Sequence, residues 1–392
     1  MLMATLFWAS VAIIIYSYFI YPLILFTFSG INQAFSDTKY LWRKRQRRIV
    51  DANELPPVSV IIAAYNEESC IKARIENLLT LDYPKEKLTF LIGSDGSRDN
   101  TAKILLDFNV DNLQVHIFDE NRGKMSVLND LVEKTNDEFI IFSDANTHFQ
   151  PDTITQLTRH FNNKAIGAVC GELHLVDGDT GDNKDNVYWR YEQVLKFHES
   201  RLNALQGANG AIYAIRKSLF IPLAANTIVD DFQIAMNVAK QGYRLVYDPE
   251  AIAIEEIAPN LAEEEGRRVR IGLGNYQAFF KMPWALNPLL GWRFIAYLSH
   301  KVCRWFVPHL MLIALISNVM LLSSQFYQAL MCAQITFYLL AFYGIKRQAS
   351  DKKTSTLIAL LAFFVAMNLA LMRGFIKYFS SNVQGTWQRT TR

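Results

Sequence analysis

The segment Glu138–Phe149, E-F-I-I-F-S-D-A-N-T-H-F, decides the fold of this chain. Its apolar run Phe139–Phe142 is short and bounded by polar residues, which predicts a fully buried strand of a parallel sheet. Asp144 follows at the carboxyl end of that strand, the edge where open α/β sheets bind ligands. Together with the amide of Asn146, its carboxylate offers two oxygens to a hard cation such as Mg²⁺ or Mn²⁺. The plain alternative is a loop cap at Asp144 and a turn at Asn146.

Three strands that are each followed by a polar loop precede this segment. Their apolar runs are Val58–Ala63, Thr89–Ile92 and Val115–Phe118. The loops are A-Y-N-E-E at 64–68, G-S-D-G-S-R-D-N-T at 93–101 and N-R-G-K at 121–124. Because strands alternate with helices in this order, the sequence predicts a doubly wound α/β domain with a mostly parallel sheet.

Apolar segments on both sides of this domain predict a multi-pass protein of the inner or plasma membrane. Leu6–Phe28 is long enough to span a bilayer, and no basic residue precedes it as in a cleaved signal peptide. The basic run Tyr40–Arg48 follows, and the positive-inside rule places it and the catalytic domain in the cytoplasm. Further apolar stretches, after a mixed interfacial segment at Pro283–His300, are Trp305–Leu322, Ala329–Tyr343 and Leu357–Leu371.

Composition limits the class of protein. With 392 residues, 51% of them hydrophobic, the chain has room for one full domain and several membrane segments. A net charge of +3 with locally clustered basic residues does not indicate nucleic-acid binding. Four cysteines without a C-x-x-C pair fit a reduced domain without disulfides or zinc. The expected divisions are a membrane helix at 1–30, a basic linker at 31–55, the α/β domain at 56–281, an interfacial helix at 282–302, membrane helices at 303–379 and a tail at 380–392.

The motifs V-S-V-I-I-A-A-Y-N-E-E, S-D-G-S-R-D-N-T, N-R-G-K and S-D-A-N resemble those of family 2 glycosyltransferases with a GT-A fold. The resemblance covers nearly the whole chain, and it is specific because four motifs occur in order, each at a strand end. It implies transfer of a sugar from a nucleotide diphosphate sugar, here a UDP-sugar, to an acceptor hydroxyl with inversion at the anomeric carbon. That reaction needs a base for the acceptor proton and stabilisation of the diphosphate leaving group.

The resemblance also implies a donor site. The positions that correspond to contacts with the nucleotide and its diphosphate are Ala64, Tyr65, Glu67, Asp95 and Lys124. Asp144 corresponds to the ligand of Mg²⁺ or Mn²⁺, which acts as a Lewis acid at the diphosphate. Asn146 stands where many relatives have a second Asp, and a neutral amide oxygen is a poorer ligand. The metal assignment therefore rests mainly on Asp144.

The second half of the domain is expected to hold the acceptor and the base. Gly207, Asn209 and Gly210 belong to a small-residue segment that relatives use beside the acceptor, with a plain turn as the alternative. Asp231 corresponds to the catalytic base and Asp230 to its acidic neighbour. Two adjacent carboxylates repel, so the pKa of one should rise. A charged helix start is the alternative interpretation of this pair.

Two further segments resemble parts of processive synthases. R-R-V-R-I at 267–271 occupies the place of their Q-x-x-R-W signature: Arg270 matches the Arg, Arg267 replaces the Gln, and Ile271 replaces the Trp that would stack an acceptor sugar. The last six residues resemble the F-x-V-T-x-K gating loop of cellulose synthases, in which Thr390 and Arg392 would contact bound nucleotide. A frayed basic terminus is the alternative.

These implications combine into a membrane-embedded inverting glycosyltransferase that extends a β-linked exopolysaccharide, in the style of synthases of poly-N-acetylglucosamine, hyaluronan and cellulose. The implied partners are the donor, a carbohydrate or lipid-linked acceptor, membrane lipid and export partners. Transfer of one sugar to a lipid carrier and a non-catalytic membrane scaffold are the alternatives. Leu357–Leu371 is expected to lie at the interface or to re-enter, because basic residues after it favour a cytoplasmic tail.

Overall fold

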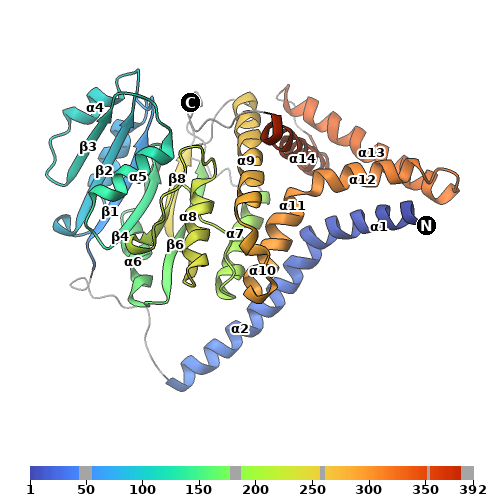
Figure 1. Ribbon diagram of the computed structural model, residues 1–392, viewed down its shortest axis with the longest axis horizontal. Coiled ribbons are helices and arrows are strands. Elements are labelled where there is room, and N and C mark those ends of the chain that lie inside the picture. The colour runs from blue at the N-terminus through green and yellow to red at the C-terminus, as the bar shows by residue number, and fades with distance from the viewer. Residues whose placement is uncertain (44–54, 177–186, 257–260, 351–353, 381–392) are drawn as a thin grey trace.

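One sheet of eight strands forms the centre of the domain that follows the first membrane helix (Figure 1). The computed structural model describes residues 1–43, 55–176, 187–256, 261–350 and 354–380. The spatial order of the strands is β3-β2-β1-β4-β7-β6-β8-β5. Their bounds are β1 Val58–Ala64, β2 Leu88–Asp95, β3 Leu113–Phe118, β4 Phe139–Asp144, β5 Thr147–Phe149, β6 Ile166–Val176, β7 Tyr213–Arg216 and β8 Arg244–Glu256.

The predicted parallel arrangement is confirmed for the first four strands. β1 pairs in parallel with β2 and β4, and β2 pairs in parallel with β3, so the loops after these strands share one edge. The register sets Ala63 of β1 directly beside Asp144 of β4. Beyond β4 the sheet is mixed, because β7 runs antiparallel to β4 and β6, and β5 runs antiparallel to β8. The loops predicted to bind the donor thus follow the parallel strands, and the predicted acceptor segment, Gly207–Gly210, precedes the antiparallel β7.

Helices cover both faces of the sheet because its strands are apolar on both faces. In β1, Val60 and Ile62 point into one core with α3 and α6, whereas Ile61 and Ala63 point into the other with α5 and α8. This alternation is what a strand buried on both sides requires. The helices of the domain are α3 Ile71–Leu79, α4 Thr101–Asp107, α5 Lys124–Lys134, α6 Thr153–Thr158, α7 Val187–Arg201, α8 Asp230–Lys240 and α9 Leu261–Lys281.

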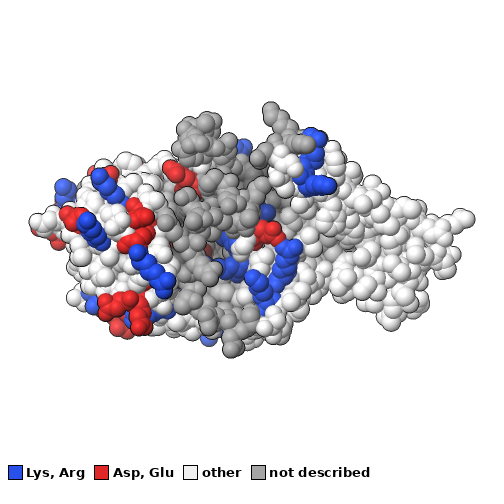
Figure 2. All heavy atoms as spheres, turned by 90° about the horizontal axis from the view of Figure 1, so that it is seen from above, with Lys and Arg blue, Asp and Glu red and all other residues white. Residues whose placement is uncertain are grey.

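Long apolar helices pack beside this domain, at the right of Figure 1. Three helical stretches are long and apolar enough to cross a membrane: Leu2–Lys39, Gln325–Gln348 and Thr356–Ser380. A fourth candidate is a pair of shorter helices that are bent by 58° where they meet. Figure 2 shows charged side chains over the sheet domain and an almost uncharged surface at the other end, as a lipid-facing region requires. The elements are α1 Leu2–Ile15, the π-helical turn η1 Tyr16–Ile20, α2 Tyr21–Arg43, α10 Trp292–Ala296, the π-helical turn η8 Tyr297–Val302, α11 Cys303–Trp305, α12 Val307–Val319, α13 Gln325–Gln348 and α14 Thr356–Ser380.

The structure corrects two expectations about the apolar helices and their flanks. The predicted basic linker at 31–55 is helical in its first part, because α2 continues to Arg43, and residues 44–54 lie outside the described residues. The interfacial segment is not one helix: it begins with two 3₁₀ turns, Pro283–Leu286 and Pro288–Leu290, and a continuous helix starts only at Trp292. Leu357–Leu371 is part of the 25-residue helix α14, and its predicted place at the interface or as a re-entrant segment stays a prediction. A break between apolar helices lies at Phe306, beside Pro308. A proline in the first turn of α12 explains that break, since it cannot continue a preceding helix.

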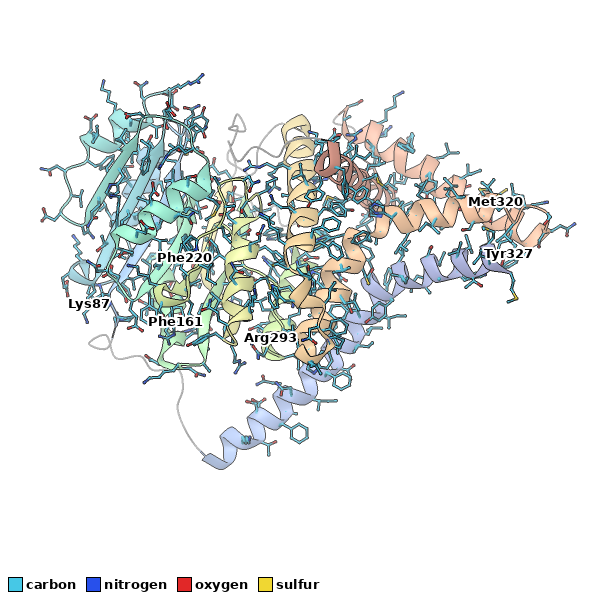
Figure 3. All side chains as sticks on the ribbon, viewed as in Figure 1. Lys87, Phe161, Phe220, Arg293, Met320 and Tyr327 are labelled. Atoms are coloured by element: carbon cyan, nitrogen blue, oxygen red, sulfur yellow. The ribbon has the colours of Figure 1, made fainter. Side chains whose placement is uncertain are left out.

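The tip of the membrane region is held by aromatic contacts. Tyr327 at the start of α13 lies edge-on to Phe7 of α1, with ring centroids 5.9 Å apart. Figure 3 shows Tyr327 near Met320 at the end remote from the sheet. At the opposite, domain-side end, Arg293 of α10 donates to the carbonyls of Ala239 and Tyr243, each at 2.8 Å (Figure 3). The broken helix is therefore anchored to the catalytic domain at its start.

A buried polar network joins α7 to the membrane helices. His300 lies between two glutamates, with Nδ1 2.7 Å from Glu199 Oε1 and Nε2 2.9 Å from Glu192 Oε2. Arg304 donates to Glu192 Oε1 at 2.5 Å, and Tyr21 donates to Glu199 Oε1 at 2.8 Å. Buried charges of this kind require partners, so the network fixes how α7 sits against the first and the broken membrane helix.

Candidate active site

Lys124 links two of the predicted acidic residues at the carboxyl edge of the sheet. Its Nζ lies 2.8 Å from Asp144 Oδ1 and 3.4 Å from Asp230 Oδ2. The three residues come from the start of α5, the end of β4 and the start of α8. Burial alone would lower the pKa of Lys124, but the charges of Asp144 and Asp230 outweigh burial and raise it, so the amine stays cationic. A fixed positive charge at this edge suits a phosphate group.

Asp95 holds the loop that places Lys124. The Asp95 side chain is fully buried, and its two oxygens accept the backbone N–H groups of Arg122 and Gly123, each at 2.9 Å. Gly123 has φ +90°, which favours glycine, and Lys124 follows as the first residue of α5. These bonds make Asp95 a support of the N-R-G-K loop, whereas a direct contact of Asp95 with nucleotide stays a prediction.

The loops after β1 and β2 are joined at the other predicted donor positions. Glu67 N donates to Thr101 Oγ1 at 2.7 Å, and Arg98 N donates to Asn66 Oδ1 at 2.8 Å. Asn66 has φ +56°, a conformation that asparagine tolerates better than most residues. Ala64 is fully buried at the end of β1, and Tyr65 beside it is half-buried. The structure thus gathers these motifs at one edge, and their contact with a nucleotide stays a prediction.

Asp231 is the residue of the acidic pair that lies against the expected acceptor segment. A Cβ atom at Gly210 would lie 3.5 Å from Asp231 Oδ2. Burial, and then repulsion from Asp230, raise the pKa of Asp231 to about 6. Gly207 has φ +86° and packs so closely on Phe232 that a Cβ would lie 2.5 Å from its ring. The predicted rise of one pKa in this pair therefore falls on Asp231, which remains ionised at neutral pH.

Asn209 is buried, and both ends of its amide are bonded within the protein. Its Nδ2 donates to the carbonyl of Gly171 at 2.8 Å, and its Oδ1 accepts from Lys196 Nζ. The structure therefore makes Asn209 a support of the Gly207–Gly210 segment. Lys196, on α7, is a residue that sequence reasoning missed, because a single lysine in an amphipathic helix carries no distinguishing signal. Its charge lowers the pKa of Asp231, although less than burial and Asp230 raise it.

Arg74 is a second residue that the sequence did not reveal. Its side chain is fully buried in α3, donates to Ser143 Oγ at 2.8 Å and lies over the ring of Phe149 at 4.4 Å. Burial lowers the pKa of Arg74 to about 9, although the charge of Asp144 opposes that shift. In the sequence it occupies a polar-looking position of an amphipathic helix, where an arginine is normally solvated. It fixes Ser143, the neighbour of Asp144.

The expected metal ligands offer oxygen donors at the end of β4. Asp144 is half-buried. Asn146 Nδ2 donates a hydrogen bond to Glu255 Oε1 of β8 at 2.8 Å, so the side-chain carbonyl oxygen is the atom of Asn146 that could coordinate a metal ion. Across the part of the chain that the structure describes, no cluster of three or more His, Cys, Asp or Glu side chains could hold a metal ion. Two protein oxygens fit Mg²⁺ or Mn²⁺, which take the rest from substrate phosphates and water.

The predicted cations of the synthase-like signature come from α9, later in the chain. Arg267 and Arg270 are exposed on α9, and Ile271 beside them is 39% exposed. Their contact with a diphosphate stays a prediction. Thr390 and Arg392 lie outside the described residues.

Comparison with known proteins confirms the resemblance that the motifs indicate. Residues 59–220 match the family model Glycosyl transferase family 2. Poly-beta-1,6-N-acetyl-D-glucosamine synthase of Staphylococcus aureus (strain COL) is 23% identical over 245 residues, which cover 59% of this chain and 58% of that protein. The protein of the same name from Staphylococcus epidermidis is 23% identical over 240 residues, covering 58% and 56%. The chain thus matches just over half the length of these curated relatives.

A solved structure shares the fold over almost the full length. Mannosyltransferase PcManGT from Pyrobaculum calidifontis, in complex with GDP-Man and Mn²⁺, superposes with a TM-score of 0.69 and 20% identity. The match covers 96% of this chain and 99% of that chain. The GT-A fold, with its mixed open sheet and accompanying apolar helices, is therefore confirmed.

Proposed function

We propose that this chain is a membrane-embedded inverting glycosyltransferase that transfers a sugar from a UDP-sugar to a growing polysaccharide, with its catalytic domain in the cytoplasm. One observation carries the proposal: Lys124 joins Asp144 to Asp230, while the next residue, Asp231, lies against Gly210. A cation for the diphosphate and a base for the acceptor thus meet at one edge of the sheet. The family match and the sequence similarity to exopolysaccharide synthases support this reading.

The donor side of the site holds a cation, Lys124, where the leaving group must be stabilised. Lys124 is held by two carboxylates, and a diphosphate oxygen can replace one of them as its partner. Because its pKa is raised, the amine remains charged throughout the reaction. A divalent cation bound by Asp144 and Asn146 would neutralise further charge on the diphosphate.

The acceptor side favours a hydroxyl nucleophile. Asp231 is ionised at neutral pH, because its pKa is about 6, and an ionised carboxylate can accept the proton of a hydroxyl. A phosphate nucleophile would need no base and would be repelled by Asp230 and Asp231. Gly210 places no side chain beside Asp231 Oδ2, which would lie 3.5 Å from a Cβ at that position. We therefore infer that the accepting group is a sugar hydroxyl.

Product analysis tests the proposal. The full chain, purified in detergent, is incubated with Mn²⁺, short β-linked oligosaccharides and a panel of donors that includes UDP-N-acetylglucosamine, UDP-glucose and GDP-mannose. The expected result is release of nucleoside diphosphate with an elongated, β-linked product from a UDP-sugar, and loss of both in Asp231→Asn. Absence of transfer from every donor, under conditions where the protein stays folded, would overturn the proposal.

Transfer of one sugar to a lipid-linked acceptor is the second candidate. The observation in its favour is Ile271, which is 39% exposed where processive synthases have a Trp that stacks an acceptor sugar. Product length separates the two: a ladder of lengths supports polymer synthesis, and a single addition to a lipid-linked saccharide supports the second candidate.

A further inference from the structure

Asn146 stands where the resembled motif has a second metal-binding aspartate, and its side chain is hydrogen-bonded to Glu255. Asn146 lies in the turn between β4 and β5, and its Nδ2 donates to Glu255 Oε1 at 2.8 Å. Glu255 comes from β8, 109 residues later in the chain, and pairs across the sheet with Thr147. The pairing of β5 with β8 therefore brings the Glu255 carboxylate to Asn146, two residues after Asp144.

This bond determines which atom of Asn146 is available to a ligand. An ionised carboxylate only accepts hydrogen bonds, so the amide must turn its NH₂ group toward Glu255. Its carbonyl oxygen is then the atom left to bind a cation. Without such an anchor, an asparagine side chain can rotate and offer its NH₂ group, which repels a cation.

We propose that Glu255 is a positioning residue for a divalent cation at Asp144, and that the Asn146–Glu255 pair replaces the second aspartate of the resembled motif. The pair presents one oxygen donor and one negative charge, as a single aspartate would, but divides them between two residues. Glu255 acts through Asn146 and through its charge, in the way that groups behind a metal ligand orient that ligand and tune its affinity. This inference rests on the proposed function, since the cation belongs to the donor site.

The competing interpretation is purely structural: the bond ties the β4–β5 turn to β8 and has no effect on a ligand. The two interpretations differ in the expected effect of exchanging the residues. In N146D, two carboxylates would face each other at the distance of a hydrogen bond, so the variant should bind a cation no better than wild type. In N146D/E255Q the carboxylate moves to position 146 and the amide to position 255, so the negative charge and the hydrogen bond are both kept. Binding of the cation should therefore recover.

The test measures Mn²⁺ binding and requires no turnover. Electron paramagnetic resonance monitors free Mn²⁺ in a titration of the full chain in detergent with saturating UDP. E255Q should weaken Mn²⁺ binding about 10- to 100-fold. E256Q is the matched control, because Glu256 is an exposed carboxylate one residue along the same strand, and it should stay within about twofold. N146D/E255Q should bind Mn²⁺ at least as tightly as wild type and more tightly than N146D.

Two results would overturn the proposal. One is equal Mn²⁺ affinities of E255Q and E256Q. The other is Mn²⁺ binding that is tighter than in wild type in N146D as well as in N146D/E255Q. Failure of the wild-type protein to bind Mn²⁺ in the presence of UDP and in the presence of GDP would instead refute the metal site of the proposed function. Unfolding temperatures of all variants identify any loss of binding that follows from loss of fold, and failure of the double exchange to recover binding would also count against the proposal.

Discussion

The pH dependence of transfer should report Asp231 directly. Burial and the adjacent Asp230 raise the pKa of Asp231 to about 6, from a usual value near 3.8. A general base is active only when it is deprotonated, so kcat/KM should be constant above about pH 7 and fall as the pH drops through 6. At pH 5 only about one tenth of the molecules carry an ionised base, and transfer should be about tenfold below its plateau.

Two substitutions assign that acid limb. Asp230→Asn removes the neighbouring negative charge that raises the pKa of Asp231, so the limb should move to lower pH by about one unit or more. Asp231→Asn should lower transfer by about two to four powers of ten and abolish the limb in the residual activity. UDP binding should survive in Asp231→Asn, because that residue lies on the acceptor side at Gly210.

Steady-state kinetics between pH 4.5 and 8, with UDP binding measured by calorimetry in the same buffers, provides the test. The assignment of the base would be refuted by an unchanged limb in both variants, or by near-normal transfer in Asp231→Asn. Stability must be checked at each pH, because protonation of other carboxylates can unfold the protein and imitate an acid limb.

Three further changes probe the supports of the site. Gly210→Ala adds a methyl group 3.5 Å from Asp231 Oδ2, so the KM for the acceptor should rise several-fold in initial-rate assays while the unfolding temperature stays unchanged. Gly207→Ala must adopt φ +86° and overlap Phe232, so calorimetry in detergent should show a loss of about 1–3 kcal/mol from backbone strain alone. His300→Leu leaves two glutamates of the junction without their shared partner, and the same measurement should show a loss of about 3–5 kcal/mol. An unfolding temperature equal to wild type in either destabilising variant would contradict the packing described for it.

The strands that carry the motifs could be predicted because their pattern depends on one physical requirement. A strand covered by helices on both faces must be apolar throughout, and Phe139–Phe142 and Val58–Ala63 satisfy this in the sequence. The carboxyl ends of parallel strands share one edge of the sheet, so Asp144 at the end of β4 and Lys124 after β3 were expected in one site. A raised pKa for one member of the Asp230–Asp231 pair was also predictable, because two adjacent carboxylates repel. Its assignment to Asp231 was not predictable, because burial is the larger cause.

The remainder depends on long-range pairing, which a local pattern does not encode. The antiparallel β7 has only four residues, Tyr213–Arg216, and nothing in them gives direction or partner. Arg74 and Lys196 are ordinary polar positions of amphipathic helices until the fold turns them toward Ser143 and Asn209. Glu255 is likewise placed by strand register alone.

The packing of the apolar helices bears on the predicted membrane topology. α14 ends beside the catalytic helix α9: Gly374 packs so closely on Leu273 that a Cβ would lie 2.5 Å from its backbone nitrogen, and Arg373 pairs with Glu265. The end of α14 near Ser380 must therefore lie on the same side of a membrane as the catalytic domain. Phe7 of α1 packs on Tyr327 at the start of α13, so the amino end of α1 and the α12–α13 connection lie at the same end, remote from the sheet. If the amino terminus is external, the pair of helices bent by 58° crosses outward and α13 crosses back, and α14 can end beside α9 only if it does not cross. The expectation that Leu357–Leu371 does not span a membrane agrees with this count and stays a prediction, although α14 is an unbroken helix of 25 residues.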